Sequence, residues 1–252
     1  MNMAICGLGK AGQALAHKII TEKDHTLTLA LCRDTSLTKG KDVGELLEMP
    51  ALGIPIIPLP QCEKALRETH TDVIIDFSGK STSLLLAEIC KKTQVHLVIC
   101  TTNFTMAEQR QVRELALAGQ VGIVFAPNLT LGINLLMGFV KKISKILLDF
   151  DFEIIERHRK DKPKVTTTAQ LISNAIDRGQ TPISSIRAGG YVGIHEVTAV
   201  SEDERVTIVH ESFSRNAFAR GAIMAAEYVI GKAGYYEMDS VINDLEKQLA
   251  KE

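Results

Sequence analysis

Tryptophan is absent from the sequence, and aromatic residues make up only 5% of its 252 residues. Proteins that bind single-stranded nucleic acid usually stack the bases on aromatic side chains, so this composition argues against such a partner. The formal net charge is −1, so no chain-wide positive charge attracts a phosphate backbone. We therefore expect no nucleic-acid partner.

Cysteine is scarce and scattered, which excludes two classes of small domain. The five cysteines are Cys6, Cys32, Cys62, Cys90 and Cys100. Their number is odd and no two of them form a Cys-x-x-Cys pair, so neither a disulfide framework nor a cysteine-based zinc site is indicated. We expect reduced, buried thiols in a cytoplasmic protein, and the sequence predicts no metal site.

Long apolar runs are also missing, although hydrophobic residues form 45% of the chain. Runs such as Leu29–Cys32 and Val73–Ile75 have the length of a β-strand and are far too short to cross a bilayer. The first residues, Met1–Gly7, lack the basic start and apolar core of a signal peptide. We predict a globular, cytoplasmic protein without a membrane partner, with one large domain or two small ones.

A glycine-rich turn follows the first apolar run. Met3–Cys6 leads directly into Gly7-x-Gly9-x-x-Gly12, and apolar residues then recur at helical spacing. In dinucleotide-binding folds such glycines permit a tight turn, close approach of the pyrophosphate and close helix packing. The alternative is a βα turn that is merely rich in glycine. The motif predicts cofactor contacts from Gly7, Gly9, Lys10, Ala11 and Gly12.

The end of the second predicted strand bears on which cofactor binds. Thr26–Cys32 is followed by Arg33 and Asp34. An acidic residue at this point would bind the ribose hydroxyls of NAD, whereas an arginine would accommodate the phosphate of NADP. Cys32 occupies the position expected for the acid, so Arg33 favours NADPH, while the nearby Asp34 keeps NADH open.

Strands and helices then alternate as far as Asn128, which predicts an α/β fold with a Rossmann-like, doubly wound parallel sheet. Ligands of such sheets bind at the carboxyl ends of the strands. Further cofactor contacts are expected there, from Phe77, Thr101, Thr102, Ala126 and Asn128. We assign residues 1–128, completed by the helices of 215–252, to a dinucleotide-binding domain.

The pattern changes after Asn128. A long helix over Leu131–Leu148 precedes strand-like segments at Phe150–Glu156, Ile183–Ala188, Ile194–Val200 and Glu204–Phe213. The last of these alternates apolar and polar residues, as in an antiparallel strand with one covered face. We predict a second α+β domain over 129–214, with a mixed or antiparallel sheet, for substrate binding and oligomerisation.

A basic segment with one histidine, Arg157–Lys164, follows the first of these strands. Pro163 is expected to interrupt regular structure there. Thr166, Thr167 and Thr168 come next and precede an apolar-periodic helix, whose N-terminus would bind anions. This arrangement suits a small substrate with more than one carboxylate. The alternative is a solvated basic loop with an incidental histidine.

The ordered motifs of the whole chain resemble the 4-hydroxy-tetrahydrodipicolinate reductase (dihydrodipicolinate reductase) family. They are Gly7-x-Gly9-x-x-Gly12, Ile75-Asp76-Phe77-Ser78, Thr101-Thr102-x-Phe104, Ala126-Pro127-Asn128, Gly132-x-Asn134-Leu135-Leu136, Glu153-Ile154-Ile155-Glu156-x-His158, Lys162, Gly193-x-His195, Ser214-Arg215 and Phe218-Ala219-x-Gly221-Ala222. In the family pattern a second histidine follows the first, and a Ser-Gly pair precedes the last threonine. Here Arg159 replaces that histidine, Thr166 and Thr167 replace the pair, and Ile194 replaces a glutamate before His195.

The resemblance implies a reaction and the residues for it. In this family NADPH or NADH delivers hydride to a cyclic imine with two carboxylates, a step of diaminopimelate and lysine biosynthesis. His158 would supply the proton, and Lys162 would neutralise a carboxylate or assist the proton transfer. The resemblance also implies a homotetramer built through the second domain. Substrate contacts are expected from Arg159, Thr166, Thr167, Thr168 and Arg215.

Two other interpretations stay open. Arg159, Thr167 and Ile194 are compatible with a reductase of the same fold that acts on a different small carboxylate or imine. A catalytically silent dinucleotide-binding relative is a third possibility, but such a relative would have no need to keep both His158 and Lys162.

Overall fold

The computed structural model describes residues 1–162 and 164–250. It divides the chain into two compact units, one formed by Met1–Leu129 with Phe218–Glu252 and the other by Thr130–Ala217. These limits lie within three residues of the predicted ones, while the binding role of each part stays a prediction. Pro163, where we expected regular structure to be interrupted, lies outside the described residues.

The first unit contains a seven-stranded parallel sheet with the order β11-β6-β5-β4-β1-β2-β3. From β3 to β6 this is the order of a doubly wound dinucleotide-binding sheet, so the predicted fold class is confirmed. The strands are β1 (Asn2–Cys6), β2 (Thr26–Cys32), β3 (Ile56–Pro58), β4 (Val73–Asp76), β5 (His96–Ile99), β6 (Gly122–Phe125) and β11 (Gly234–Glu237).

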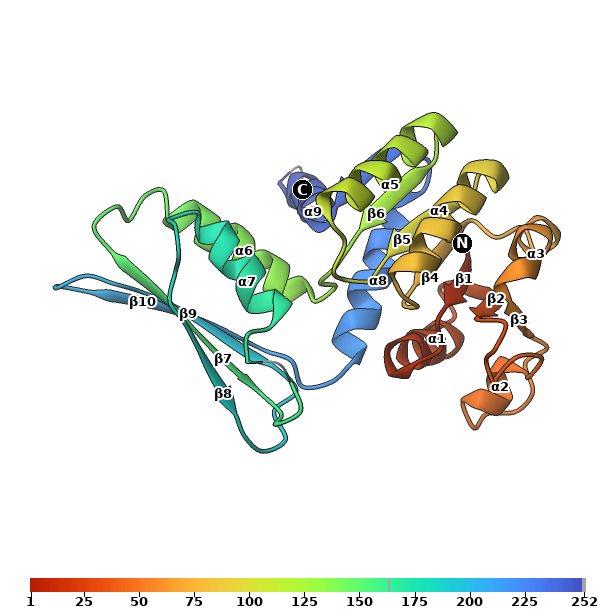
Figure 1. Cartoon of the computed structure of the whole chain (residues 1–252), viewed down its shortest axis with the longest axis horizontal. Coiled ribbons are helices and arrows are strands. Elements are labelled where there is room, and N and C mark those ends of the chain that lie inside the picture. The colour runs from red at the N-terminus through yellow and green to blue at the C-terminus, as the bar shows by residue number, and fades with distance from the viewer. Residues whose placement is uncertain (163, 251–252) are drawn as a thin grey trace. The chain divides into compact units, whose positions relative to one another are not determined.

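Helices cover both faces of this sheet, so its central strands are buried and almost uniformly apolar. Figure 1 shows α4 and α5 on one side, and α1 and α8 on the other. Ala4 and Cys6 of β1 join the core cluster formed with α3, α4 and α5. The helices are α1 (Lys10–Glu22), α2 (Val43–Leu46), η1 (Leu59–Gln61), α3 (Cys62–Glu68), α4 (Lys80–Thr93), α5 (Met106–Gly119), α8 (Asn216–Val229) and α9 (Met238–Leu249).

The second unit is a four-stranded mixed sheet covered on one face by two helices (Figure 1). Its order is β10-β9-β7-β8, with β7 parallel to β8 and antiparallel to β9. This confirms the predicted α+β architecture. The elements are α6 (Leu131–Ile143), β7 (Asp151–His158), α7 (Thr167–Ile176), β8 (Ile183–Arg187), β9 (Ile194–Val200) and β10 (Arg205–Glu211).

The register of this sheet positions the candidate site. Glu156 on β7 lies directly opposite His195 on β9, and His195 lies opposite His210 on β10. Alternation along β7 keeps Glu156 and His158 on the same face of the sheet. Side chains that are far apart in sequence therefore meet beside the covering helices.

The predicted long helix at Leu131–Leu148 is wrong in its second part, because α6 ends at Ile143. The guanidinium of Arg178 donates hydrogen bonds to the carbonyl oxygens of Ser144, Leu148 and Phe150. These carbonyls are thus satisfied by a side chain from after α7 rather than by a continued helix. No helix in the described part of the chain is both long and apolar enough to span a membrane.

Candidate active site

Two glycines of the β1–α1 segment leave no room for a side chain. Gly7 has φ +88°, in the left-handed region that glycine adopts without strain. A Cβ atom there would lie 2.8 Å from the backbone of Phe77 and Ser78. At Gly12 a Cβ atom would lie 2.1 Å from the carbonyl oxygen of Gly7. Both positions exclude a side chain, in keeping with the tight turn and close helix packing of the motif.

Gly9, in contrast, faces open space at the N-cap of α1. Apart from its two chain neighbours, nothing in the described residues lies within 4 Å of a Cβ atom built there. An anion can therefore approach the backbone closely, and the N–H groups at the start of a helix lack intrahelical partners. Lys10 and Ala11 form the first turn of α1. The turn fits the pyrophosphate of a dinucleotide.

A cavity of about 240 Å³ adjoins this turn. Three of the predicted cofactor residues line it: Gly7, Gly9 and Arg33. Asp34, whose presence in the sequence left NADH as an alternative cofactor, forms an ion pair with the ammonium of Lys39 at 2.7 Å. The sequence did not assign the other lining residues to the cofactor, although Leu8 and Ser78 belong to its motifs and Cys32 was noted at the end of the second strand. They are Cys6, Leu8, Cys32, Ser36, Thr38, Leu59, Ser78 and Thr82.

The other predicted cofactor residues do not line this cavity: Lys10, Ala11 and Gly12 lie in α1, and the rest lie in the turns after β4, β5 and β6. Phe77 donates its N–H to the carbonyl of Cys6 at 2.8 Å. The hydroxyls of Thr101 and Ser83 are 2.9 Å apart. The remaining residues of this set are Thr102, Ala126 and Asn128.

A buried carboxylate ties these turns together. Asp76, at the end of β4, has no exposed surface. It accepts hydrogen bonds from the Ser78 backbone N–H at 2.9 Å and from the Ser83 hydroxyl at 2.5 Å. Burial raises the pKa of Asp76, and the bonds from Ser78 and Ser83 oppose that rise. Because Ser83 also bonds Thr101, the network holds the turns after β4 and β5 in fixed positions.

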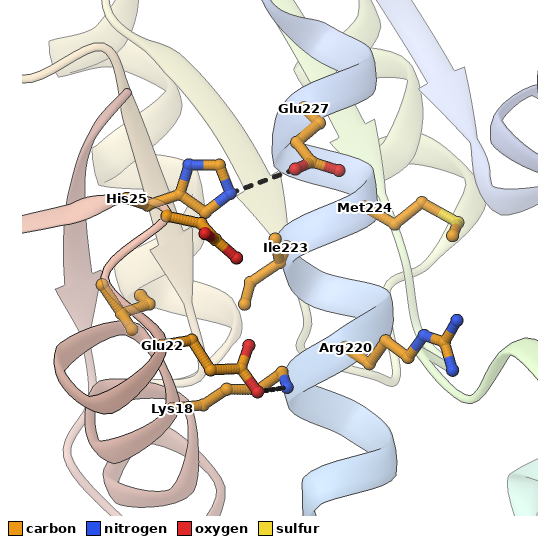
Figure 2. Close-up of a pocket in the computed structure, with 9 residues that line it drawn as sticks. Lys18, Glu22, His25, Arg220, Ile223, Met224 and Glu227 are labelled. Carbon is orange, nitrogen blue, oxygen red and sulfur yellow. Dashed lines mark hydrogen bonds and ion pairs between the residues drawn. The ribbon is translucent and has the colours of Figure 1, made fainter.

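A second cavity, of about 390 Å³, lies between α1 and α8. Figure 2 shows two pairs among the side chains that line it, Lys18 with Glu22 and His25 with Glu227. Its lining includes none of the residues that the sequence predicted for a site.

In the second unit, His158 is buried at the end of β7, with 7% of its surface exposed. Its Nδ1 atom lies 3.3 Å from the carbonyl oxygen of Val192. A carbonyl only accepts, so Nδ1 carries a proton, and the neutral ring has its lone pair on Nε2. That Nε2 atom lies 3.4 Å from Nε2 of His195. A Cβ atom at Gly193 would lie 2.8 Å from the His158 ring.

The contacts of His158 explain the Gly193-x-His195 motif. Gly193 leaves room for the edge of the His158 ring, and His195 meets the ring at its Nε2 atom. The two rings pack edge to face, with their centroids 5.1 Å apart. The sequence displayed this motif but did not indicate that both of its residues serve His158.

Glu156 completes the cluster and has no exposed surface. Its Oε1 atom accepts hydrogen bonds from the hydroxyl of Ser185 at 2.7 Å and from the guanidinium of Arg187 at 2.5 Å. Its Oε2 atom accepts the Thr166 hydroxyl and lies 3.8 Å from Nε2 of each histidine. Burial would raise the pKa of Glu156, but these hydrogen bonds outweigh burial and lower it. Glu156 is therefore ionised.

Both histidines are neutral near pH 7. Burial lowers the pKa of His158, although the Glu156 carboxylate opposes the effect. Burial, reinforced by the neighbouring His158, lowers the pKa of His195 to about 4. The cluster thus holds one negative charge and two uncharged rings.

Arg187 fastens the basic segment to this cluster. Besides binding Glu156, its guanidinium donates to the carbonyl oxygens of Lys162 at 3.4 Å and Lys164 at 2.6 Å. One side chain on β8 therefore holds both the buried carboxylate and the backbone of the loop. Nothing in the sequence pointed to this role, because Arg187 stands outside every motif.

The side chains of the segment are more exposed than those of the cluster. Arg159 is paired with Asp161 at 3.2 Å, and 42% of its side chain is exposed. Lys162 is exposed, and its charge adds to the lowering of the pKa of His158. The two predicted catalytic residues thus differ: His158 is enclosed, and Lys162 faces solvent.

The three threonines are placed differently from one another. Thr166 is the N-cap of α7, and its hydroxyl accepts from the Ala169 N–H while donating to Glu156. Thr167 is exposed at the first position of α7, and Thr168 follows it, half-buried. Arg215 is exposed between β10 and α8. In the described residues, no hydrogen bond or ion pair joins Arg215 to the histidine cluster.

Comparison with known families accounts for both parts of the chain. The N-terminus of dihydrodipicolinate reductase matches residues 1–129, and the C-terminus of that protein matches residues 132–242. The chain belongs to the dihydrodipicolinate reductase family. Its relatives are NAD(P)H-dependent oxidoreductases, so the chain is an enzyme of that class.

Individual members of the family are similar to this chain over nearly its full length. The 4-hydroxy-tetrahydrodipicolinate reductase of Methanosarcina barkeri is 34% identical, over 96% of this chain and 99% of that protein. The enzyme of the same name from Buchnera aphidicola is 33% identical, over 96% and 98% respectively.

Solved structures confirm the fold. The dipicolinate-bound dihydrodipicolinate reductase of Paenisporosarcina sp. TG-14 has a TM-score of 0.78 at 24% identity, over 94% of this chain and 97% of that chain. An amine dehydrogenase from Mycobacterium smegmatis has a TM-score of 0.70 at 12% identity, over 93% and 94%. The fold is therefore shared with oxidoreductases outside the family.

Proposed function

We propose that the chain catalyses the NADPH- or NADH-dependent reduction of 4-hydroxy-tetrahydrodipicolinate to tetrahydrodipicolinate, in which the hydroxyl leaves as water before the hydride is added, in diaminopimelate and lysine biosynthesis. The observation that carries the proposal is that a chain belonging to the reductase family along both of its parts keeps His158 and Lys162. The glycine turn of the first unit supports the cofactor, and the histidine cluster of the second supports the proton transfer.

The residues of the first unit fit a nicotinamide dinucleotide. The N-terminus of α1 and the open space at Gly9 would hold the pyrophosphate. Arg33, with the hydroxyls of Ser36 and Thr38 beside it, offers donors for a phosphate on the ribose. When bound, the cofactor supplies the hydride.

His158 is the proposed proton donor. Hydride addition to the unsaturated substrate leaves a nitrogen-stabilised anion, which requires a proton from a group that titrates near neutrality. A bound dicarboxylate would raise the pKa of His158, because negative charge favours the imidazolium. In the structure, Nδ1 of His158 contacts the Val192 carbonyl and Nε2 contacts His195. Donation to the substrate therefore exchanges one of these contacts for the substrate.

The basic segment and α7 are the proposed carboxylate sites. The pair between Arg159 and Asp161 is exposed, and such surface pairs contribute little, so Arg159 can exchange Asp161 for a substrate carboxylate. Thr167 and Thr168 begin the ten-residue α7, where backbone N–H groups favour anions. Thr166 acts indirectly, because its hydroxyl is committed to Glu156 and to the helix cap.

Replacing Lys162 with alanine is expected to raise KM roughly 10- to 100-fold and to lower kcat as well. A charge-assisted bond to a carboxylate contributes about 1.5–3 kcal/mol, which corresponds to this range. Steady-state kinetics would measure both constants. Lys160→Ala is the matched control, since Lys160 is exposed in the same loop but stands outside the family motif. Equal effects of the two substitutions would contradict the assignment of Lys162.

Replacing Arg33 with alanine is expected to weaken NADPH binding roughly 10- to 100-fold, because a charged partner of the ribose phosphate is lost. NADH, which lacks that phosphate, should bind within about twofold of wild type. Isothermal titration of both cofactors measures the difference. Lys39→Ala removes a neighbouring cation that does not line the cavity and serves as the control. A parallel loss for both cofactors would reject Arg33 as the phosphate ligand.

Turnover of the dihydrodipicolinate precursor with either cofactor tests the reaction itself. The competing candidate is a different small carboxylate or imine, favoured by Arg159 and Thr167 in place of the family residues. Suppose the wild type is inert while Arg159→His, combined with Thr166→Ser and Thr167→Gly, is active. The assigned substrate would then be wrong, although the fold and cofactor would stand.

We further propose a cytoplasmic homotetramer assembled through the sheet of the second unit. All five cysteines are free, as a reducing compartment favours. Exposed apolar side chains such as Ile186 and Val209 lie on strands β8 and β10, and exposed apolar surface favours association. Light scattering at micromolar concentration should give a tetramer, and Val209→Arg should shift it toward smaller species. A monomeric wild type would refute the assembly.

A further inference from the structure

We propose that Glu156, His158 and His195 bind one divalent ion of intermediate softness, such as Zn²⁺ or Co²⁺, and that this ion inhibits the enzyme. The three residues come from two neighbouring strands, and one ligand atom of each lies within 4.8 Å of the others. All three are buried. The inhibition rests on the proposed function, whereas the binding does not.

The spacing of the nitrogens matches a tetrahedral ion. Two nitrogens that each lie about 2.0–2.1 Å from Zn²⁺ are roughly 3.3–3.4 Å apart in tetrahedral geometry. The Nε2 atoms of His158 and His195 are 3.4 Å apart. The Oε2 atom of Glu156 is 3.8 Å from each of them. The carboxylate therefore needs to approach the two nitrogens by roughly half an ångström, which would complete a triangle of three ligand atoms around the ion.

Neighbouring groups already orient two of the three ligands. The bond from Nδ1 of His158 to the Val192 carbonyl leaves the lone pair on Nε2, a pattern typical of metal-binding histidines. Ser185 and Arg187 hold Oε1 of Glu156, so that Oε2 is turned toward the rings. Nδ1 of His195 is buried and has no hydrogen-bond partner in the described protein. Binding an ion at Nε2 would place the ring proton on this Nδ1.

The charges and donor types decide which ion fits. Two uncharged imidazoles and one carboxylate suit Zn²⁺, Co²⁺ or Ni²⁺, whereas Mg²⁺ and Ca²⁺ prefer sites made of oxygen. The guanidinium of Arg187 repels a divalent ion, so we expect micromolar affinity rather than that of a structural zinc site. Three protein ligands leave a fourth position, which water or the Thr166 hydroxyl, 3.4 Å from His195 Nε2, can fill.

Inhibition follows from competition for one atom. The lone pair of Nε2 on His158 accepts either a proton or the ion, and the reduction requires the proton. The ion would also hold the ring against His195, which keeps His158 from exchanging a contact for the substrate. Zn²⁺ should therefore inhibit the reductase reversibly, with activity restored by EDTA and unaffected by Mg²⁺.

Cobalt provides a test that does not depend on turnover. Metal-free, full-length protein titrated with Co²⁺ should develop the visible absorption of a four-coordinate ion and saturate at one ion per chain. His195→Gln and His158→Gln should each weaken this binding at least tenfold. His210→Gln is the matched control, because His210 is a half-buried histidine on the adjacent strand and lies outside the triangle. Circular dichroism and NADPH titration would verify that each variant is folded.

A gain of affinity offers a second, independent variant. Thr166→Cys places a thiolate near the fourth position and should tighten Co²⁺ binding at least tenfold, with added charge-transfer absorption. The proposal is overturned if the wild type shows no saturable Co²⁺ absorption below millimolar concentration. It is also overturned if the histidine substitutions leave binding unchanged. A protein that binds Co²⁺ as described but reduces no substrate would refute the proposed reaction and leave the site intact.

Discussion

Replacing His158 with glutamine is expected to lower kcat by about 10²–10⁴, the usual contribution of a positioned general acid. Glutamine keeps a donor for the Val192 carbonyl and approximates the volume of the ring, so the buried cluster should persist. The amide cannot deliver a proton at neutral pH. KM should change by only a few-fold, since the carboxylate sites lie on Arg159, Lys162 and α7. Steady-state kinetics and single-turnover hydride transfer would measure both effects.

His210→Gln is a useful companion, because it changes a half-buried histidine of the same sheet, on β10, that has no part in the proposed chemistry. Its kcat should remain within a few-fold of wild type. If His158→Gln kept wild-type turnover, the proton would have to come from Lys162 or from solvent. His158 would then be a structural residue of the cluster.

Replacing Gly12 with alanine is expected to destabilise the first unit by about 3 kcal/mol, at the upper end of the cost of overpacking. The new Cβ atom would lie 2.1 Å from the Gly7 carbonyl oxygen, so the start of α1 must move away from β1. For a chain of this size the melting temperature should fall by roughly 6–12 °C. NADPH binding should weaken as well, because the displaced turn carries the predicted phosphate site.

Gly9→Ala is the matched control for this effect. The same methyl group enters open space there, so the melting temperature should stay within about 2 °C of wild type. NADPH affinity should nevertheless fall, since the methyl occupies the approach of the pyrophosphate. Thermal unfolding and cofactor titration on both variants separate packing from binding. A stable Gly12→Ala protein would show that α1 can shift without cost.

Local sequence patterns predicted most of the fold, and the exceptions have physical causes. Strands such as Val73–Asp76 are apolar except for their last residue because helices cover both faces of their sheet, and this made them easy to recognise. β11 was missed, because Gly234–Glu237 is short, lacks an aliphatic run and pairs only with β6 at the edge of the sheet. The end of α6 was misplaced, because Arg178 lies about thirty residues beyond the carbonyls that it binds.

The residues of the candidate site show the same difference between those that a local motif identifies and those that only the fold brings together. The sequence could single out motif residues such as Gly7, Gly12 and His158, because backbone geometry or proton chemistry restricts their identity, while their roles remain predictions. Ser185 and Arg187 were not found, because their partner Glu156 stands about thirty positions away and becomes a neighbour only through the pairing of β7 with β8. The sequence also assigned Thr166 to the substrate, whereas in the structure its hydroxyl is committed to Glu156.

Arg187 has a consequence for how this enzyme can change. The path of the basic loop depends on main-chain oxygens of Lys162 and Lys164, which any amino acid would supply. Substitutions in the loop can therefore alter what its side chains touch without dislodging its backbone. Arg159 in place of a histidine, and threonines in place of a Ser-Gly pair, are substitutions of this kind. Side-chain substitutions in this loop can therefore change the substrate preference, while Arg187 on β8 keeps the loop backbone in place.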